Sequence, residues 1–61
     1  MVQFIIQPNG DYDVETIYGQ RIGSIARDFD GAFYFWPINN GGAWSRHSLR
    51  TIADKLDELN K

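Results

Sequence analysis

The stretch RIGSIARDFDGAFYFW, residues 21–36, decides the fold of this 61-residue chain. Two runs typical of β-strands, residues 21–27 and 32–36, flank the dipeptide Asp30-Gly31. Asp-Gly between such runs is a strong hairpin signal, because both central residues of a type I′ turn adopt positive φ. The sequence therefore predicts an antiparallel hairpin with a two-residue loop. The cross-strand pairs expected from that loop are Phe29 with Ala32, Arg27 with Tyr34, and Ile25 with Trp36.

The second strand of this hairpin has two different faces. Side chains alternate along a strand, so Phe33 and Phe35 point to one side and Tyr34 and Trp36 to the other, whatever the register. Phe33 and Phe35 are purely apolar, and we expect their side of the hairpin to receive a helix. In the expected register that side also carries Ile22, Ser24 and Ala26, the last two small enough to let a helix approach.

The C-terminal third reads as an amphipathic helix. Its apolar residues follow the i, i+3, i+4, i+7, i+10 spacing of one helix face: Leu49, Ile52, Ala53, Leu56 and Leu59. Ser45 is the expected N-cap. Trp44 before it and Leu49 after it are placed for a hydrophobic staple.

The N-terminal third adds strands to the hairpin. Residues 2–7, VQFIIQ, alternate as a β run, and residues 12–16 are a candidate short edge strand. The predicted fold class is therefore α+β. We expect a small antiparallel sheet of three to four strands with one C-terminal amphipathic helix packed on one face, in a single domain spanning residues 1–61.

Composition excludes several classes of protein. The chain has no cysteine and one histidine, His47, which leaves neither a disulfide nor a multi-histidine zinc site. A domain of this size usually needs a disulfide, a metal or self-association. That leaves oligomerisation or an unusually well-packed core, and we expect a homodimer. The longest apolar run, residues 32–36, is too short to span a bilayer, and we expect a soluble, cytoplasmic protein. The net charge of −2 argues against binding to duplex nucleic acid.

The aromatic side of the hairpin is the first candidate site. One helix covers only one face of a small sheet, so the other face stays open unless the N-terminal loop folds over it as a second small core. Tyr, Trp and Arg dominate interface hot spots. The residues expected to bind a partner are Ile25, Arg27, Phe29, Tyr34 and Trp36.

The start of the helix is the second candidate site. A glycine loop that runs into a helix N-terminus presents free N–H groups to an anion, and basic residues add positive charge there. A tryptophan could stack a base beside it. An ordinary solvated helix start is the alternative. The possible anion-binding residues are Gly41, Gly42, Trp44, Arg46, His47 and Arg50.

No residue pattern favours catalysis, a metal or a cofactor. The acidic residues at positions 11, 13 and 15 and at positions 28 and 30 lack the spacing of a calcium loop, and turn chemistry explains them. Ser45, His47 and Ser48 lack an acidic orienting group, and neighbours one and two apart on a helix do not face each other. We therefore expect a protein that is not an enzyme.

Three segments resemble small accessory proteins of tailed bacteriophages and prophages. The segments are Asp30-Gly31-x-Phe33-x-Phe35-Trp36-Pro37, Gly41-Gly42-x-Trp44-Ser45, and Leu49-Arg50-x-Ile52-Ala53-Asp54-Lys55-Leu56-Asp57-Glu58-Leu59-Asn60. The resemblance covers roughly residues 20–60 and carries no catalytic residue. It implies a protein of the host cell cytoplasm that binds and disables a host or defence protein.

The leading expectation is thus a non-enzymatic phage-type inhibitor that acts by protein–protein interaction through the aromatic sheet face. One alternative is a homodimer that sequesters a nucleotide-like anion between its tryptophans and the helix start. A nucleic-acid-binding module is a second alternative, which the acidic balance disfavours.

Overall fold

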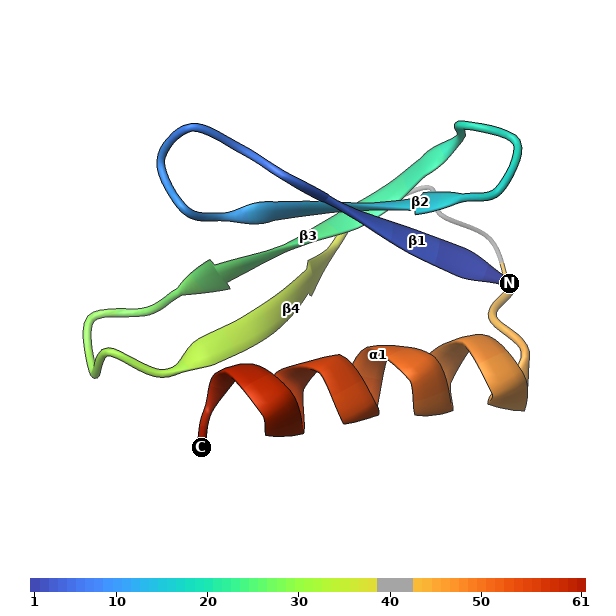
Figure 1. Ribbon diagram of the computed structural model, residues 1–61. Coiled ribbons are helices and arrows are strands. Elements are labelled where there is room, and N and C mark those ends of the chain that lie inside the picture. Colours follow the sequence, from blue (N-terminus) through green and yellow to red (C-terminus); the bar gives the residue numbers. More distant parts are fainter. Residues whose placement is uncertain (39–42) are drawn as a thin grey trace.

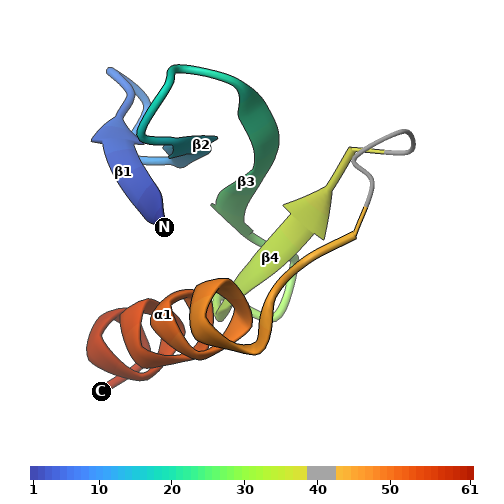
Figure 2. The same ribbon diagram turned by 90° about the vertical axis from the view of Figure 1, so that its right-hand side faces the viewer.

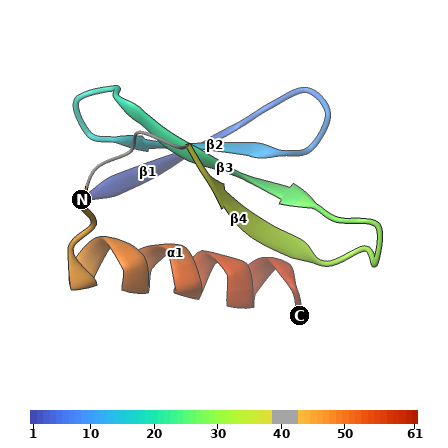
Figure 3. The same cartoon turned by 180° about the vertical axis from the view of Figure 1, so that it is seen from behind.

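The computed structural model describes residues 1–38 and 43–61 as a four-stranded antiparallel sheet and one C-terminal helix. The strands follow chain order, β1-β2-β3-β4, and α1 lies across one face of the sheet (Figures 1 and 3). Viewed along the helix, the strands form an arc over α1 (Figure 2). This confirms the predicted α+β class. The elements are β1 (Val2–Ile6), β2 (Tyr12–Thr16), β3 (Arg21–Arg27), β4 (Phe33–Pro37) and α1 (Arg46–Leu59).

All three hairpins are closed by the same three-residue loop. In each, the N–H of the residue before the loop donates to the carbonyl of the residue after it, at 2.7–3.0 Å. The third loop residue is a glycine with positive φ: 90° at Gly10, 88° at Gly19 and 85° at Gly31. This is a type I turn followed by a left-handed residue, a common hairpin closure that glycine permits.

The predicted two-residue loop at Asp30-Gly31 is therefore wrong. The loop holds Phe29 as well, and only Gly31 has positive φ. The Asp30 carboxylate accepts a hydrogen bond from the Ala32 N–H at 3.0 Å, which stabilises the wider turn. One extra loop residue shifts the register by one. The observed pairs are Ile25 with Phe35, Ala26 with Tyr34, and Arg27 with Phe33.

A β-bulge changes the alternation along β3. Val14 pairs with Gly23, but the next residue, Glu15, pairs with Arg21. Ile22 is thus an extra residue that has no partner on β2. Because of the bulge, Ile22 and Ile25 are both buried although they are an odd number of residues apart.

The inner face of the sheet is the face toward α1, and register places twelve residues on it: Val2, Phe4, Ile6, Tyr12, Val14, Thr16, Gly23, Ile25, Arg27, Phe33, Phe35 and Pro37. Val14 and Ile25 are fully buried, and they form the core with Ile22 and Ile52. Phe33 and Phe35 pack against this core, as predicted. Ser24 and Ala26 were predicted on this face and lie on the opposite one, because the register differs by one residue.

Gly23 is required by the close approach of two β4 residues, Phe35 and Trp36. A Cβ at this position would lie 2.6 Å from the Trp36 carbonyl oxygen and 2.7 Å from the Phe35 ring. The Phe35 ring therefore occupies the space that a side chain at position 23 would need.

The helix begins at its predicted cap. The Ser45 hydroxyl accepts from the Ser48 N–H at 3.1 Å. The predicted apolar stripe is only partly correct, because the helix turns Ser48 and Ile52 into the core and leaves Leu49 and Ala53 exposed. Leu56 and Leu59 pack at the edge of the core, as expected. Within the described residues, no helix is long and apolar enough to cross a membrane.

Lys55 completes the contact between the helix and the first hairpin. Its ammonium lies 4.9 Å from the centre of the Tyr12 ring and 5.7 Å from that of Phe4. Its aliphatic stem is half-buried at the helix–sheet boundary while the charge reaches the ring faces.

Candidate protein-binding face

The outer face of the sheet is the face away from α1. Among the described residues, no helix or strand packs against it (Figures 1 and 2). Directly paired residues share a face, and the register gives two cross-strand rows, Ile5-Asp13-Ser24-Trp36 and Gln3-Glu15-Arg21, with the pair Ala26-Tyr34 beside them. The outer face thus combines apolar, acidic and aromatic side chains.

Tyr34 and Trp36 form an aromatic pair on this face. Their ring centroids are 6.4 Å apart and their planes meet at 66°, an edge-to-face arrangement. The Trp36 indole N–H donates to the Ala26 carbonyl at 3.3 Å. The two residues are nevertheless 42% and 46% exposed. A large apolar area is therefore held in one orientation and left open to solvent.

An acid–phenol hydrogen bond fixes the position of Tyr34. Its hydroxyl donates to Asp30 Oδ2 at 2.6 Å. This hydrogen bond lowers the pKa of Asp30 below 3.8, with a smaller contribution from the Ala32 N–H. The same bond raises the pKa of Tyr34 above 10.0, and the charge of Asp30 adds to the effect. At neutral pH the phenol is thus a fixed donor and Asp30 a fixed anion at the edge of the aromatic pair.

Small side chains separate the aromatic pair from a second carboxylate. Ser24 and Ala26 lie between β4 and β2 on the outer face. Beyond Ser24, Asp13 is held by the Arg21 guanidinium at 3.4 Å and by the Gln7 amide at 3.2 Å. Across the outer face, the aromatic pair on β4 is therefore followed by small side chains on β3 and by the hydrogen-bonded carboxylate of Asp13 on β2.

The structure brings together only part of the predicted partner-binding set. Tyr34 and Trp36 lie exposed and adjacent, as expected. Ile25 was expected on the exposed face, but it is fully buried, because the three-residue loop pairs it with Phe35. Arg27 lies at the end of the inner face, with its guanidinium 4.8 Å from the Phe33 ring centre. Phe29 is 99% exposed in the hairpin loop, outside the sheet.

Among the contributors to the outer face that sequence reasoning missed are Ile5, Asp13 and Asp30. Ile5 follows Phe4 in a β run, so alternation alone places it opposite the core. The two aspartates were assigned only to turns, and nothing local in the sequence indicates that Asp30 accepts from Tyr34 four residues later.

Of the predicted anion site, the structure describes Trp44 on the side of the core and three basic residues on the exposed side of the helix. Gly41 and Gly42 lie outside the described residues. Trp44 is half-buried against the core. Arg46, His47 and Arg50 are exposed on the helix. Their helical positions share the side opposite Ile52, which faces the core, and so point away from the sheet.

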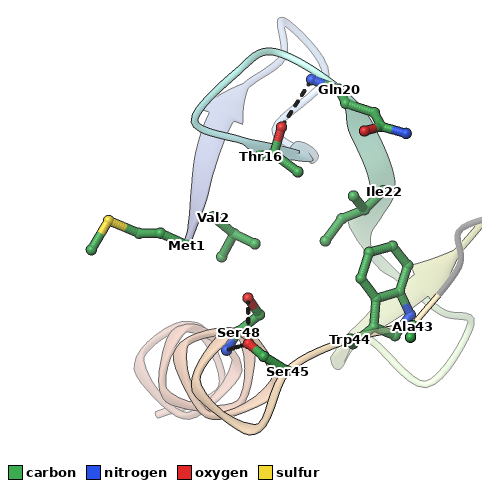
Figure 4. Close-up of a pocket in the computed structure, with 9 residues that line it drawn as sticks. All are labelled: Met1, Val2, Thr16, Gln20, Ile22, Ala43, Trp44, Ser45 and Ser48. Carbon is green, nitrogen blue, oxygen red and sulfur yellow. Dashed lines mark hydrogen bonds between the residues drawn. The ribbon is translucent and has the colours of Figure 1, made fainter.

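A cavity of about 320 Å³ opens beside the helix start (Figure 4). Val2, Ile22 and Trp44 point into it, and the hydrogen-bonded hydroxyls of Ser45 and Ser48 form its floor. The other lining residues are Met1, Thr16, Gln20 and Ala43. None of the described lining residues carries a charged side chain, and the Met1 amino group is the one cation among them.

A comparison of the chain with protein-family models, with curated proteins and with solved structures finds no match. The functional argument therefore depends on the geometry of the chain itself.

Proposed function

We propose that this chain is a non-enzymatic binding protein that docks a partner protein on the outer face of its sheet. The observation that carries the proposal is the Tyr34–Trp36 pair, two half-exposed rings held by hydrogen bonds on a face without a helix. Fixed aromatic rings favour binding, because little side-chain freedom remains to be lost when a partner covers them. Tyrosine and tryptophan also dominate measured interface hot spots.

Charge indicates which kind of partner fits. Residues 1–38, which include the whole sheet, have a net charge of −3, whereas residues 43–61 have a net charge of +1. Asp13 and Glu15 lie on the outer face and Asp30 lies at its margin. A protein surface with arginine or lysine side chains would meet carboxylates and aromatic ring faces together, and both attract cations. The resemblance to phage accessory proteins supports an inhibitory role against a host or defence protein.

The alternative of an anion sequesterer has less support. Among the described residues that line the cavity beside Trp44, none has a charged side chain and the Met1 amino group is the one cation. The three basic residues near the helix start are not among those that line it. A nucleotide that raised the melting temperature of the wild-type chain but not of Trp44→Ala would favour the sequesterer.

The proposal is tested by capture of partners from bacterial lysate with matched baits. The wild-type chain, Trp36→Thr and Leu49→Thr are immobilised, and bound proteins are identified by mass spectrometry. Trp36 and Leu49 are similarly exposed, at 46% and 48%, but only Trp36 lies on the outer face. A partner retained by wild type and Leu49→Thr and lost with Trp36→Thr supports the proposal. Equal capture by all three baits would contradict it.

The charge argument is tested with that partner in purified form. Replacing Asp30 with Asn removes a carboxylate at the margin of the aromatic pair. We expect the dissociation constant of the complex to rise several-fold and its dependence on salt to weaken. An Asp30→Asn complex as tight and as salt-dependent as the wild-type complex would rule out a cationic partner surface at this point.

A further inference from the structure

The two edges of the sheet are protected to different degrees. Two backbone hydrogen bonds mark the two ends of the β3–β4 pairing. The N–H of Asp28 donates to the Ala32 carbonyl, and the N–H of Ile38 donates to the Ile22 carbonyl. Since bonded residues alternate along an antiparallel pair, the backbone groups of Phe33, Phe35 and Pro37 point away from β3. The Asn60 side chain occupies both groups of Phe33, accepting from its N–H at 2.8 Å and donating to its carbonyl at 3.0 Å. Pro37 has no N–H to offer.

The β1 edge has no such protection. The N–H of Gln7 donates to Asp11 at 2.7 Å, and the same alternation directs the backbone groups of Val2, Phe4 and Ile6 away from β2. Within residues 1–38 and 43–61, no strand and no side-chain hydrogen bond covers these groups. The strand has no charged residue and no proline, and its register against β2 is regular. Edge strands normally carry such features to prevent pairing with another chain.

We propose that the β1 edge pairs with the β1 edge of a second copy of this chain, antiparallel and centred on Phe4. The centring follows from the hydrogen-bond pattern, because only Val2, Phe4 and Ile6 have free groups. Phe4 would exchange two bonds with its symmetry mate, and Val2 would exchange two with the partner's Ile6 at each end. Three residue pairs then form across the interface, and every free backbone N–H and carbonyl of Val2, Phe4 and Ile6 is hydrogen-bonded.

Side chains favour a second copy over a foreign strand. In this register Ile6, which is 65% exposed although it lies on the inner face, packs beside Val2 of the other copy. Ile5 packs beside the other Gln3 on the outer face. No charged side chain is buried, since β1 has none. The apolar residues at one end of β1 face the apolar residues at the other end of the second copy. Self-association is also a usual stabilising device for a chain this small that has no cysteine.

The pairing has a consequence for binding. A two-fold axis perpendicular to the sheet at Phe4 leaves both outer faces on the same side of an eight-stranded sheet. Both Tyr34–Trp36 pairs would be presented together, so that a repetitive or dimeric target could be held at two points. The edge pairing itself does not depend on the proposed function of the outer face.

Sedimentation and hydrogen exchange test this proposal with the full chain. Wild type is expected to approach twice the 7.0 kDa of one chain as its concentration rises. The amide protons of Phe4 and Ile6 should become slower to exchange over the same concentration range, because the pairing bonds them. Ile6→Lys should weaken dimerisation at least about tenfold. Ile17→Lys, an isoleucine of similar exposure in the second loop, should leave it unchanged.

Ile6→Pro is the second variant, since the backbone N–H that it removes has no partner among the described residues. It should fold and remain monomeric. A dimer that persists in both Ile6 variants would overturn the proposal. A wild-type chain that stays monomeric at about millimolar concentration, with fast exchange at Phe4 and Ile6, would overturn it as well.

Discussion

The inner and outer faces of the sheet both carry large apolar side chains, but only the inner face is closed by a helix. On the inner face, Val14 and Ile25 are fully buried beneath Ile52 of α1. On the outer face, Tyr34 and Trp36 keep almost half of their surface exposed, and their polar atoms are hydrogen-bonded within the chain. The comparison teaches that apolar area on the inner face stabilises the fold, whereas apolar area on the outer face stays open to solvent and is available for the contact with another molecule that we propose.

Isoleucines on the two faces provide the sharpest stability contrast. Ile25→Ala should cost about 2–5 kcal/mol, the usual loss for a buried isoleucine. The whole free energy of unfolding expected for a chain of this length is roughly 3–9 kcal/mol. Ile5→Ala, on the outer face at 40% exposure, should cost less than about 1.5 kcal/mol. Chemical denaturation of both variants measures the difference, and equal losses would mean that both faces belong to the core.

Gly23 offers a contrast between neighbours on the same strand. A methyl group at position 23 would overlap the Trp36 carbonyl and the Phe35 ring, so Gly23→Ala should lose about 1–3 kcal/mol through overpacking. Ser24→Ala, which places a methyl group on the outer face, should change stability by less than about 0.5 kcal/mol. A stable Gly23→Ala with native melting behaviour would show that β3 and β4 are not this close.

The Asn60 side chain should contribute a moderate, local effect at the β4 edge. Asn60→Ala removes two hydrogen bonds to Phe33. Each such bond contributes no more than about 1.5 kcal/mol to the free energy of unfolding. We expect faster amide exchange at Phe33 and little change at Tyr34, whose N–H is bonded to β3. Asn60→Asp is the matched control, because it keeps an acceptor for the Phe33 N–H and loses the donor.

The smallest expected effect is the pH dependence of the Tyr34–Asp30 bond. Because the pKa of Asp30 is lowered on folding, its contribution to stability is present above pH 3.8 and is lost as the pH falls through the lowered value. Because the pKa of Tyr34 is raised on folding, the contribution of its phenol to stability is present below pH 10.0. That contribution is lost as the pH rises through the raised value. In Asp30→Asn, an NMR titration should show the pKa of Tyr34 fall toward 10.0. An unchanged titration would mean that the bond does not hold the ring.

The sequence predicted the elements well and their alignment poorly. The helix and its Ser45 cap follow from local spacing, and the opposite directions of Phe33 and Tyr34 follow from alternation alone. The register could not be read from Asp30-Gly31, because glycine with positive φ closes two-residue and three-residue loops alike. One usable signal was the equal placement of Gly10, Gly19 and Gly31, each the third residue of its loop.

The sequence also predicted the candidate site only in part, finding its aromatic pair but misplacing Ile25. Tyr34 and Trp36 were found because β4 alternates cleanly. Ile25 was misplaced because its position depends on the loop length, and the bulge at Ile22 further changes which residues of β3 are buried. Both features arise from pairing between strands, which no single segment of the sequence encodes.

The central claim is that the outer-face aromatic rings serve binding more than folding, and one paired measurement on Trp36→Thr tests it most directly. The free energy of unfolding and the dissociation constant for the captured partner are measured on the same preparation. The account predicts a folded variant that loses no more than about 2 kcal/mol of stability and binds its partner at least roughly thirtyfold more weakly, the loss typical of a hot-spot residue. A variant that binds as tightly as wild type, or one that unfolds as Ile25→Ala is expected to, would contradict it.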